Sequence, residues 1–174
     1  MKPLPPGPKD LAPALVNVLV EIPMGSRIKY EMDHDTGLVS VDRVLFSPLH
    51  YPAEYGFIPS TLALDGDPCD ALVLITGSTF PGVLLQARPI GLLKMADEKG
   101  EDDKVLCVAA HDPSYEHVKE LEDLPPHFLK EVSHFFQTYK ELEGKLVLIL
   151  GWEGRKAALA FIEQCIHAHE GSHA

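Results

Sequence analysis

The sequence lacks an excess of basic residues. Asp and Glu total 26 against 15 Lys and Arg, which gives a formal net charge of −11 at pH 7. Proteins that bind nucleic acid gain much of their affinity by placing Lys and Arg against the phosphate backbone. This balance argues against DNA or RNA as a partner, and any other anionic ligand would need cations beside it.

Cysteines and long apolar runs are also scarce. Cys69, Cys107 and Cys165 are odd in number, far apart and form no CxxC pair. A disulfide framework or a thiolate metal site is therefore not expected, and a reducing cytoplasm fits best. No apolar run approaches the roughly 20 residues of a membrane-spanning helix, and MKPLPPGPKD has no continuous hydrophobic region like that of a signal peptide. We expect a cytoplasmic protein with no membrane partner.

The length and composition are those of one globular domain. The chain has 174 residues, of which 45 % are hydrophobic, enough for a sizeable core. We expect a single domain over residues 1–174, with an extended Pro-rich arm at 1–13 and a frayed tail at 170–174. The histidines of the C-terminal end, His167, His169 and His173, are interpreted as solvated rather than as a metal site.

The periodicity of apolar residues changes along the chain. From Ala14 to about Ala110, short β-prone runs such as LVNVLVEI, ALVLITG and KVLCVAA alternate with turn residues. From Pro125 the apolar residues follow one stripe of a helix, and a second amphipathic helix is predicted from Arg155 to about His169. The pattern predicts a mainly β, α+β fold, in which an antiparallel sheet or small barrel carries two helices packed outside.

Two clusters of carboxylates stand out. The segment DGDPCD, Asp65 to Asp70, places three carboxylates in a short stretch, and ADEKGEDDK supplies Asp97 and Asp102, followed by Lys104. Asp, Gly and Pro are ordinary turn residues, so a solvated turn explains DGDPCD, and a charged hairpin loop explains the second cluster. Carboxylates without His or Cys also suit Mg²⁺, Mn²⁺ or Ca²⁺. Composition alone leaves both interpretations open.

Charged residues also interrupt the predicted strands. Glu21 lies within VLVEIP, Lys29 and Glu31 share one face of IKYEMD, and the parity of Arg43 in VSVDRV points it inward unless a bulge intervenes. Each one alone is more typical of an ordinary salt bridge. Together they indicate a polar cavity in the barrel wall, because charges on an inward face need partners.

Two tyrosines precede the first acidic cluster. Tyr51 and Tyr55 belong to HYPAEYGFIPS, a segment that contains Pro and Gly. Aromatic packing explains them, and so does a hydroxyl donor to an anionic oxygen. The residues alone do not decide between the two.

Taken in order, these motifs resemble the soluble family I inorganic pyrophosphatases of bacterial type. The resemblance rests on VEIP, IKYE, VDR, YPAEYGFIPSTL, DGDPCDA, DEKGEDDK and HFFQTYK, and it runs from about residue 15 to the C-terminal helix. DGDPxD in that company is highly specific. The resemblance implies a five-stranded OB-like antiparallel β-barrel with flanking helices, Mg²⁺-dependent hydrolysis of inorganic diphosphate to two phosphates, and a homohexamer.

The same resemblance implies a role for each motif residue. It makes Asp67 the general base for in-line attack by a metal-activated water, at a site with several Mg²⁺ ions for which Mn²⁺ or Zn²⁺ can substitute. The implied metal ligands are Asp65, Asp70, Asp102, Asp97, Glu31 and Glu21. The implied substrate contacts are Lys29, Arg43, Tyr55, Lys104, Tyr139 and Lys140, with Tyr51 in support.

One strand departs from the family pattern, and one function of another class stays open. GKLVLILGW stands where the family commonly reads GKWVKVEGW, so Leu146, Leu148 and Leu150 replace an aromatic and two polar residues. Packing or subunit contacts on this strand are expected to differ. The alternative function is a noncatalytic OB-type nucleic-acid-binding module, which the charge of −11 disfavours. A protein that binds metal without turnover is a third hypothesis.

Overall fold

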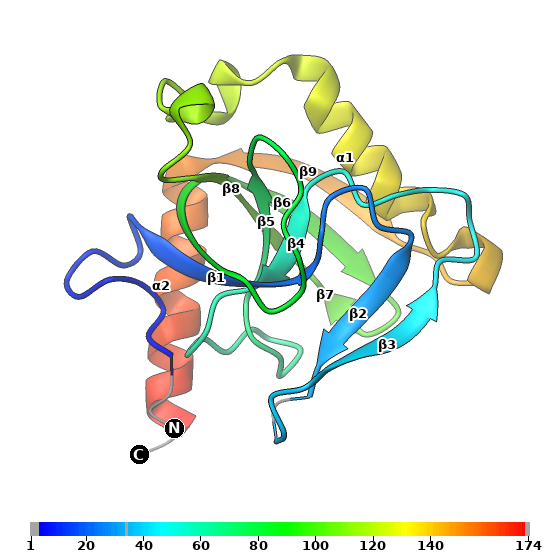
Figure 1. The fold of residues 1–174 in the computed structure, drawn as a ribbon, viewed down its shortest axis with the longest axis horizontal. Coiled ribbons are helices and arrows are strands. Elements are labelled where there is room, and N and C mark those ends of the chain that lie inside the picture. Colours follow the sequence, from blue (N-terminus) through cyan, green and yellow to red (C-terminus); the bar gives the residue numbers. More distant parts are fainter. Residues whose placement is uncertain (1–3, 34, 173–174) are drawn as a thin grey trace.

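Strands are the main regular elements of the structure, a computed structural model that describes residues 4–33 and 35–172 (Figure 1). The strands are β1 (Val16–Ile22), β2 (Ile28–Met32), β3 (Val39–Val44), β4 (Glu54–Phe57), β5 (Asp70–Leu74), β6 (Leu84–Asp97), β7 (Gly100–Glu101), β8 (Lys104–Ala109) and β9 (Leu148–Gly154). Helix α1 (Pro126–Thr138) precedes β9, and helix α2 (Arg155–Ser172) follows it. Short 3-10 turns are η1 (Pro113–Tyr115), η2 (Leu121–Asp123) and η3 (Glu141–Glu143).

Strands β1, β4, β5, β8 and β6 pair in that order, and β6 pairs back to β1. Strands β7 and β9 extend β6, and β2 pairs with β3 in a separate sheet. The predicted OB-like, mainly β fold is confirmed, but the prediction of a wholly antiparallel barrel is wrong, because β5 and β8 run parallel with Ala71 opposite Val105. A ring with an odd number of strands cannot alternate direction all the way round, so at least one neighbouring pair must be parallel.

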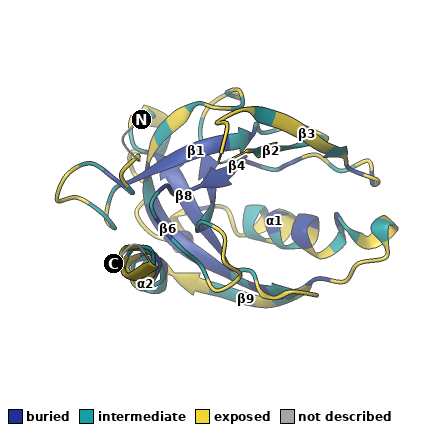
Figure 2. Cartoon of the chain, turned by 90° about the horizontal axis from the view of Figure 1, so that it is seen from below, coloured by how far each residue is buried: buried dark blue, intermediate teal, exposed yellow. Residues whose placement is uncertain are grey.

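The two α-helices cover opposite faces of the barrel strands. Along β5, Leu72 packs in the buried cluster that contains Phe136 of α1, whereas its neighbour Val73 packs in the cluster that contains Ile162 of α2. Successive side chains of a strand point to opposite faces, so each helix shields one of them. Figure 2 shows the buried strands β6 and β8 with α1 to one side and α2 to the other. Burial on both faces explains why β8 reads as a continuous apolar run after its first lysine.

The N-terminal segment differs from the extended arm expected at 1–13. Residues 6–15 form bends and turns, in which the Leu15 amide donates to the Leu11 carbonyl at 2.9 Å. The Asn17 side chain donates to the Pro5 carbonyl at 3.1 Å and anchors the segment to β1. Proline fixes only φ, and that φ suits turns as well as extended chain. At the other end, α2 extends to Ser172, into the segment expected to fray, and residues 1–3, 34, 173 and 174 lie outside the described residues.

Candidate functional site

A cleft of about 410 Å³ opens between the barrel, the β2–β3 hairpin and the C-terminal end of α1. All the residues proposed from sequence line it except Tyr51. They are Glu21, Lys29, Glu31, Arg43, Tyr55, Asp65, Asp67, Asp70, Asp97, Asp102, Lys104, Tyr139 and Lys140. The fold therefore brings motifs from nearly the whole chain to one place.

The segment DGDPCD forms one lip of the cleft. Asp65 Oδ1 accepts a hydrogen bond from the Asp67 amide at 3.1 Å, and Gly66 between them has φ 92°, a conformation that strains any L side chain. Asp70 then begins β5, opposite β4. Asp65 and Asp67 are exposed, whereas Cys69 is fully buried. The turn thus directs carboxylates outward and anchors the chain through one apolar side chain.

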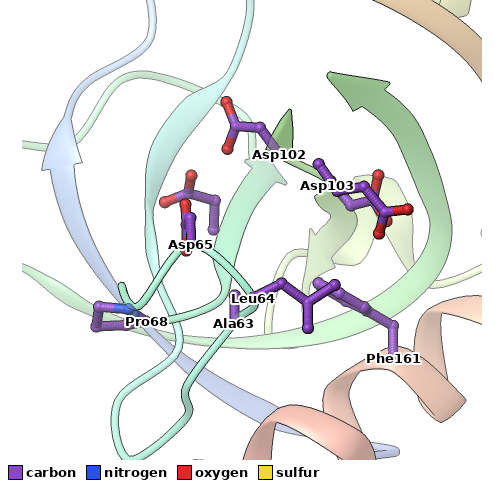
Figure 3. Close-up of a pocket in the computed structure, with 9 residues that line it drawn as sticks. Ala63, Leu64, Asp65, Pro68, Asp102, Asp103 and Phe161 are labelled. Atoms are coloured by element: carbon purple, nitrogen blue, oxygen red, sulfur yellow. The ribbon is translucent and has the colours of Figure 1, made fainter. Parts of the chain in front are cut away.

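A buried lysine joins two carboxylates at the floor of the cleft. Lys104 Nζ lies 2.5 Å from Asp70 Oδ2 and 2.5 Å from Asp102 Oδ1, and its side chain is 3 % exposed. Burial opposes the charge, but the two carboxylates raise the pKa of Lys104 above its ordinary value. Figure 3 shows Asp102 and the next residue, Asp103, pointing apart. Asp103 is buried and forms an ion pair with Lys94, so it stabilises the β6–β8 region.

The β2–β3 hairpin supplies a second group of charges. Lys29 pairs with Glu31 and lies 3.3 Å from Asp42 Oδ2, and Arg43 pairs with Asp42 and places Nε 2.9 Å from Glu143 Oε1. Although burial opposes it, Lys29 and Arg43 lower the pKa of Asp42 below its ordinary value. These contacts hold both cationic side chains at the edge of the cleft.

Sequence reasoning missed Asp42 and Glu143. Strand alternation alone would place Asp42 on the face opposite Arg43. The β2–β3 register shifts, however, because Lys29 pairs with Arg43 whereas the next residue, Tyr30, pairs with Val41. Asp42 is the extra residue of this bulge, and a bulge re-aims a side chain. Glu143 comes from η3, and no local pattern links it to Arg43.

Carboxylate crowding is most evident at Glu21. Burial raises the pKa of Glu21 to about 7, and Asp70 and Glu31 add to the rise, while the Met32 amide and Lys29 oppose it. The Met32 amide donates to Glu21 Oε1 at 2.8 Å. Negative charge is therefore unfavourable here without a cation nearby.

The carboxylates fit a hard divalent cation by chemistry but do not surround one. The Asp and Glu side chains that line the cleft offer oxygen ligands, and no His or Cys lines it. Within residues 4–33 and 35–172, no three His, Cys, Asp or Glu side chains are arranged to hold one metal ion. Lysines occupy the positions beside the carboxylates instead, and Lys140 Nζ lies 3.1 Å from Asp97 Oδ2.

The tyrosines divide between core and cleft. Tyr51 is buried, with its ring centroid 4.8 Å from that of Phe135, so it packs behind the site. Tyr55 and Tyr139 line the cleft, and Lys104 Nζ lies 5.7 Å from the ring centre of Tyr55. Burial raises the pKa of Tyr55 well above its ordinary value, so its hydroxyl remains a hydrogen-bond donor at neutral pH. With five lysines and an arginine also lining it, the cleft offers hydrogen-bond donors to a small polyanion.

Comparisons with known proteins agree with this geometry. The family model described as inorganic pyrophosphatase matches residues 18–170. The chain is 53 % identical over 148 residues to the inorganic pyrophosphatase of Methanosarcina acetivorans, covering 85 % of this chain and 88 % of that one. It is 49 % identical over 174 residues to the inorganic pyrophosphatase of Thermus thermophilus, covering 98 % of each. A crystal structure of inorganic pyrophosphatase from Thermus thermophilus aligns with a TM-score of 0.93 at 48 % identity, over 97 % of both chains.

Proposed function

The chain belongs to the inorganic pyrophosphatase family and hydrolyses inorganic diphosphate, and we propose that it does so in the cleft described above, with Mg²⁺ as the cofactor and Asp67 as the general base. The family itself implies a divalent metal. One observation supports the location of the reaction above all others. Every residue to which the motifs assign chemistry, apart from the supporting Tyr51, lines this single cleft.

The proposed metal ligands are the carboxylates of the cleft. Asp65, Asp70, Asp102, Asp97, Glu31 and Glu21 would hold several Mg²⁺ ions, with Mn²⁺ or Zn²⁺ as substitutes. The raised pKa of Glu21, caused by burial and neighbouring carboxylates, supports this because a nearby cation relieves the same repulsion. When bound, divalent ions supply positive charge to the diphosphate oxygens and make water more acidic.

Asp67 is a carboxylate of the cleft that stays free to accept a proton. Asp70, Asp97 and Asp102 each pair with a lysine, whereas no Lys, Arg or His within the described part of the chain forms an ion pair with Asp67. Its side chain is exposed to the cleft. Asp67 therefore remains available to take the proton of the water that attacks phosphorus, as the bond to the bridging oxygen breaks.

The cations and hydroxyls of the cleft would bind the phosphate oxygens. The proposed contacts are Lys29, Arg43, Tyr55, Lys104, Tyr139 and Lys140. Phosphoryl transfer depends mainly on positioning and on stabilising charge, so this set needs no covalent nucleophile. Two residues that sequence reasoning did not predict, Asp42 and Glu143, hold Lys29 and Arg43 in place.

We also propose a homohexamer of single-domain subunits in the cytoplasm. Support for assembly comes from Leu146, Leu148 and Leu150, which are 80 %, 64 % and 63 % exposed at alternate positions entering and along β9. Exposed apolar rows of this kind mark interaction surfaces.

Support for a reducing compartment comes from the three free cysteines. No helix in the described residues combines the length and apolarity needed to cross a membrane.

A phosphate-release assay tests the proposal. Purified protein should release phosphate from diphosphate with Mg²⁺, lose the activity with chelator, and leave ATP and tripolyphosphate largely intact. Substantial chelator-resistant turnover would contradict the metal dependence. Binding of Mg²⁺ without phosphate release would contradict catalysis and favour a metal-binding protein.

A further inference from the structure

Two cysteines meet behind the acidic loop, although they are far apart in sequence. Cys69 belongs to DGDPCD and is fully buried, and Cys165 on α2 is 3 % exposed. The Cys69 thiol donates to the Asp70 carbonyl at 3.8 Å, and its sulfur is also in side-chain contact with that of Cys165. The Leu62 amide also donates to the Cys165 carbonyl at 2.9 Å. The loop and α2 are thus joined by a backbone hydrogen bond and by contact between two sulfur atoms.

Neither thiol has a part in the hydrolysis proposed above. Both are free, and both pack in the same buried cluster as the third cysteine, Cys107 of β8. Within residues 4–33 and 35–172, Cys107 forms no hydrogen bond through its thiol. The chain therefore contains one contacting pair of thiols and one buried thiol that serves as an internal control.

We propose that Cys69 and Cys165 are a redox modification site, where oxidation by a peroxide joins the two cysteines in a reversible disulfide. The disulfide would slow diphosphate hydrolysis, so this effect rests on the proposed function. Cys165 is the more exposed residue of the two, at 3 % against 0 % for Cys69. It attacks the peroxide, the O–O bond breaks, and a sulfenic acid and one water form. The Cys69 sulfur then displaces the second water as the S–S bond forms. Two thiols and one hydrogen peroxide give one disulfide and two waters, with two electrons passing from sulfur to oxygen.

The disulfide would act on the site through the loop backbone. Bonded sulfur atoms are about 2 Å apart, closer than in a hydrogen-bond contact, so Cys69 must move towards α2. Asp70 follows directly and begins β5, and successive strand side chains point to opposite faces. Drawing Cys69 towards α2 therefore draws the Asp70 carboxylate out of the cleft and shifts Asp67 on the other side. Displacements of about 1 Å in an active site can cost about 100-fold in rate.

The full chain treated with hydrogen peroxide, followed by catalase, tests the proposal. Peptide mass spectrometry should find Cys69 linked to Cys165, and dithiothreitol should release the link. The diphosphate hydrolysis rate with Mg²⁺ should fall by about 10- to 100-fold and recover with dithiothreitol. Absence of the linked peptide would overturn the proposal, as would a linked peptide without a change in rate. A chain with no hydrolysis before oxidation would instead contradict the proposed function, since the mass measurement does not depend on turnover.

Matched variants separate the disulfide from general oxidation. Cys107→Ala removes a buried thiol of the same cluster and should behave like wild type. Cys165→Ala should hydrolyse diphosphate before oxidation and keep its rate afterwards. Circular dichroism checks folding, and Cys165→Ser replaces the alanine variant if that one does not fold. Equal inactivation of Cys165→Ala and wild type, or a link between Cys69 and Cys107, would overturn the proposal.

Discussion

Glu21 should make the stability of the metal-free protein depend on pH. Burial, together with nearby carboxylates, raises the pKa of Glu21 from 4.5 to about 7. The folded protein therefore holds the proton of the Glu21 carboxyl group more tightly than the unfolded chain does. The stability contributed by the protonated group is fully present below about pH 4.5 and is lost as the pH rises through about 7.

The size of this loss follows from the same values. Each pH unit between 4.5 and about 7 corresponds to about 1.36 kcal/mol, which gives about 3.4 kcal/mol before solvent screening and about 2–3 kcal/mol after it. Glu21→Gln keeps an oxygen for the Met32 amide but cannot ionise. We expect Glu21→Gln to exceed wild type in unfolding free energy by about 2–3 kcal/mol at pH 8 and to match it near pH 4.

Urea unfolding in chelator at the two pH values measures the effect. Glu31→Gln removes the same charge from a side chain that is 55 % exposed in the same cleft, and it should show a much smaller dependence on pH. Added Mg²⁺ should reduce the advantage of Glu21→Gln at pH 8, because a nearby cation favours the carboxylate. A difference between Glu21→Gln and wild type that is equal at both pH values, or larger at pH 4, would refute the reasoning.

Three further changes test the other roles. Asp67→Asn should lower kcat by about 100-fold or more with little change in the urea midpoint, and a near-wild-type rate would remove Asp67 from the role of base. Lys104→Met leaves two partly buried carboxylates without their cation, so the unfolding free energy in chelator should fall by about 3–5 kcal/mol. A loss below about 1 kcal/mol would contradict the role of Lys104 in neutralising Asp70 and Asp102. Glu143→Gln removes the ion pair that holds Arg43, so KM for diphosphate should rise by about threefold to tenfold in a folded protein. An unchanged KM would show that Arg43 binds substrate without the ion pair to Glu143.

Local patterns predicted much of this architecture because they report burial directly. The short apolar runs, such as the one in β8, arise from burial of the strands, the helical stripe from Pro125 arises from packing on one side, and both elements form. The motif residues converge on one cleft because each motif carries its chemistry within a few residues of the end of a strand or, for Tyr139 and Lys140, of helix α1. Asp97, at the end of β6, and Lys104, at the start of β8, are examples.

What the sequence left unpredicted depends on long-range geometry. The parallel β5–β8 pair is a property of the ring and not of either strand. Asp42 enters the cleft only because the hairpin register shifts beside it. The contact between Cys69 and Cys165 requires α2 to pack behind the acidic loop, and no local spacing encodes that packing.

The lysine pairs explain how an acidic cleft can accept a polyanion. Lys29 pairs with Glu31, Lys104 with Asp70 and Asp102, and Lys140 with Asp97. Each lysine proposed to bind phosphate is thus held by a carboxylate proposed to bind metal. Without divalent ions, the two charges satisfy each other and few donors remain for diphosphate. Once the carboxylates have divalent partners, the same lysines can turn to the phosphate oxygens. Affinity for diphosphate should therefore rise with Mg²⁺ concentration through these residues, in addition to any direct contact between metal and substrate.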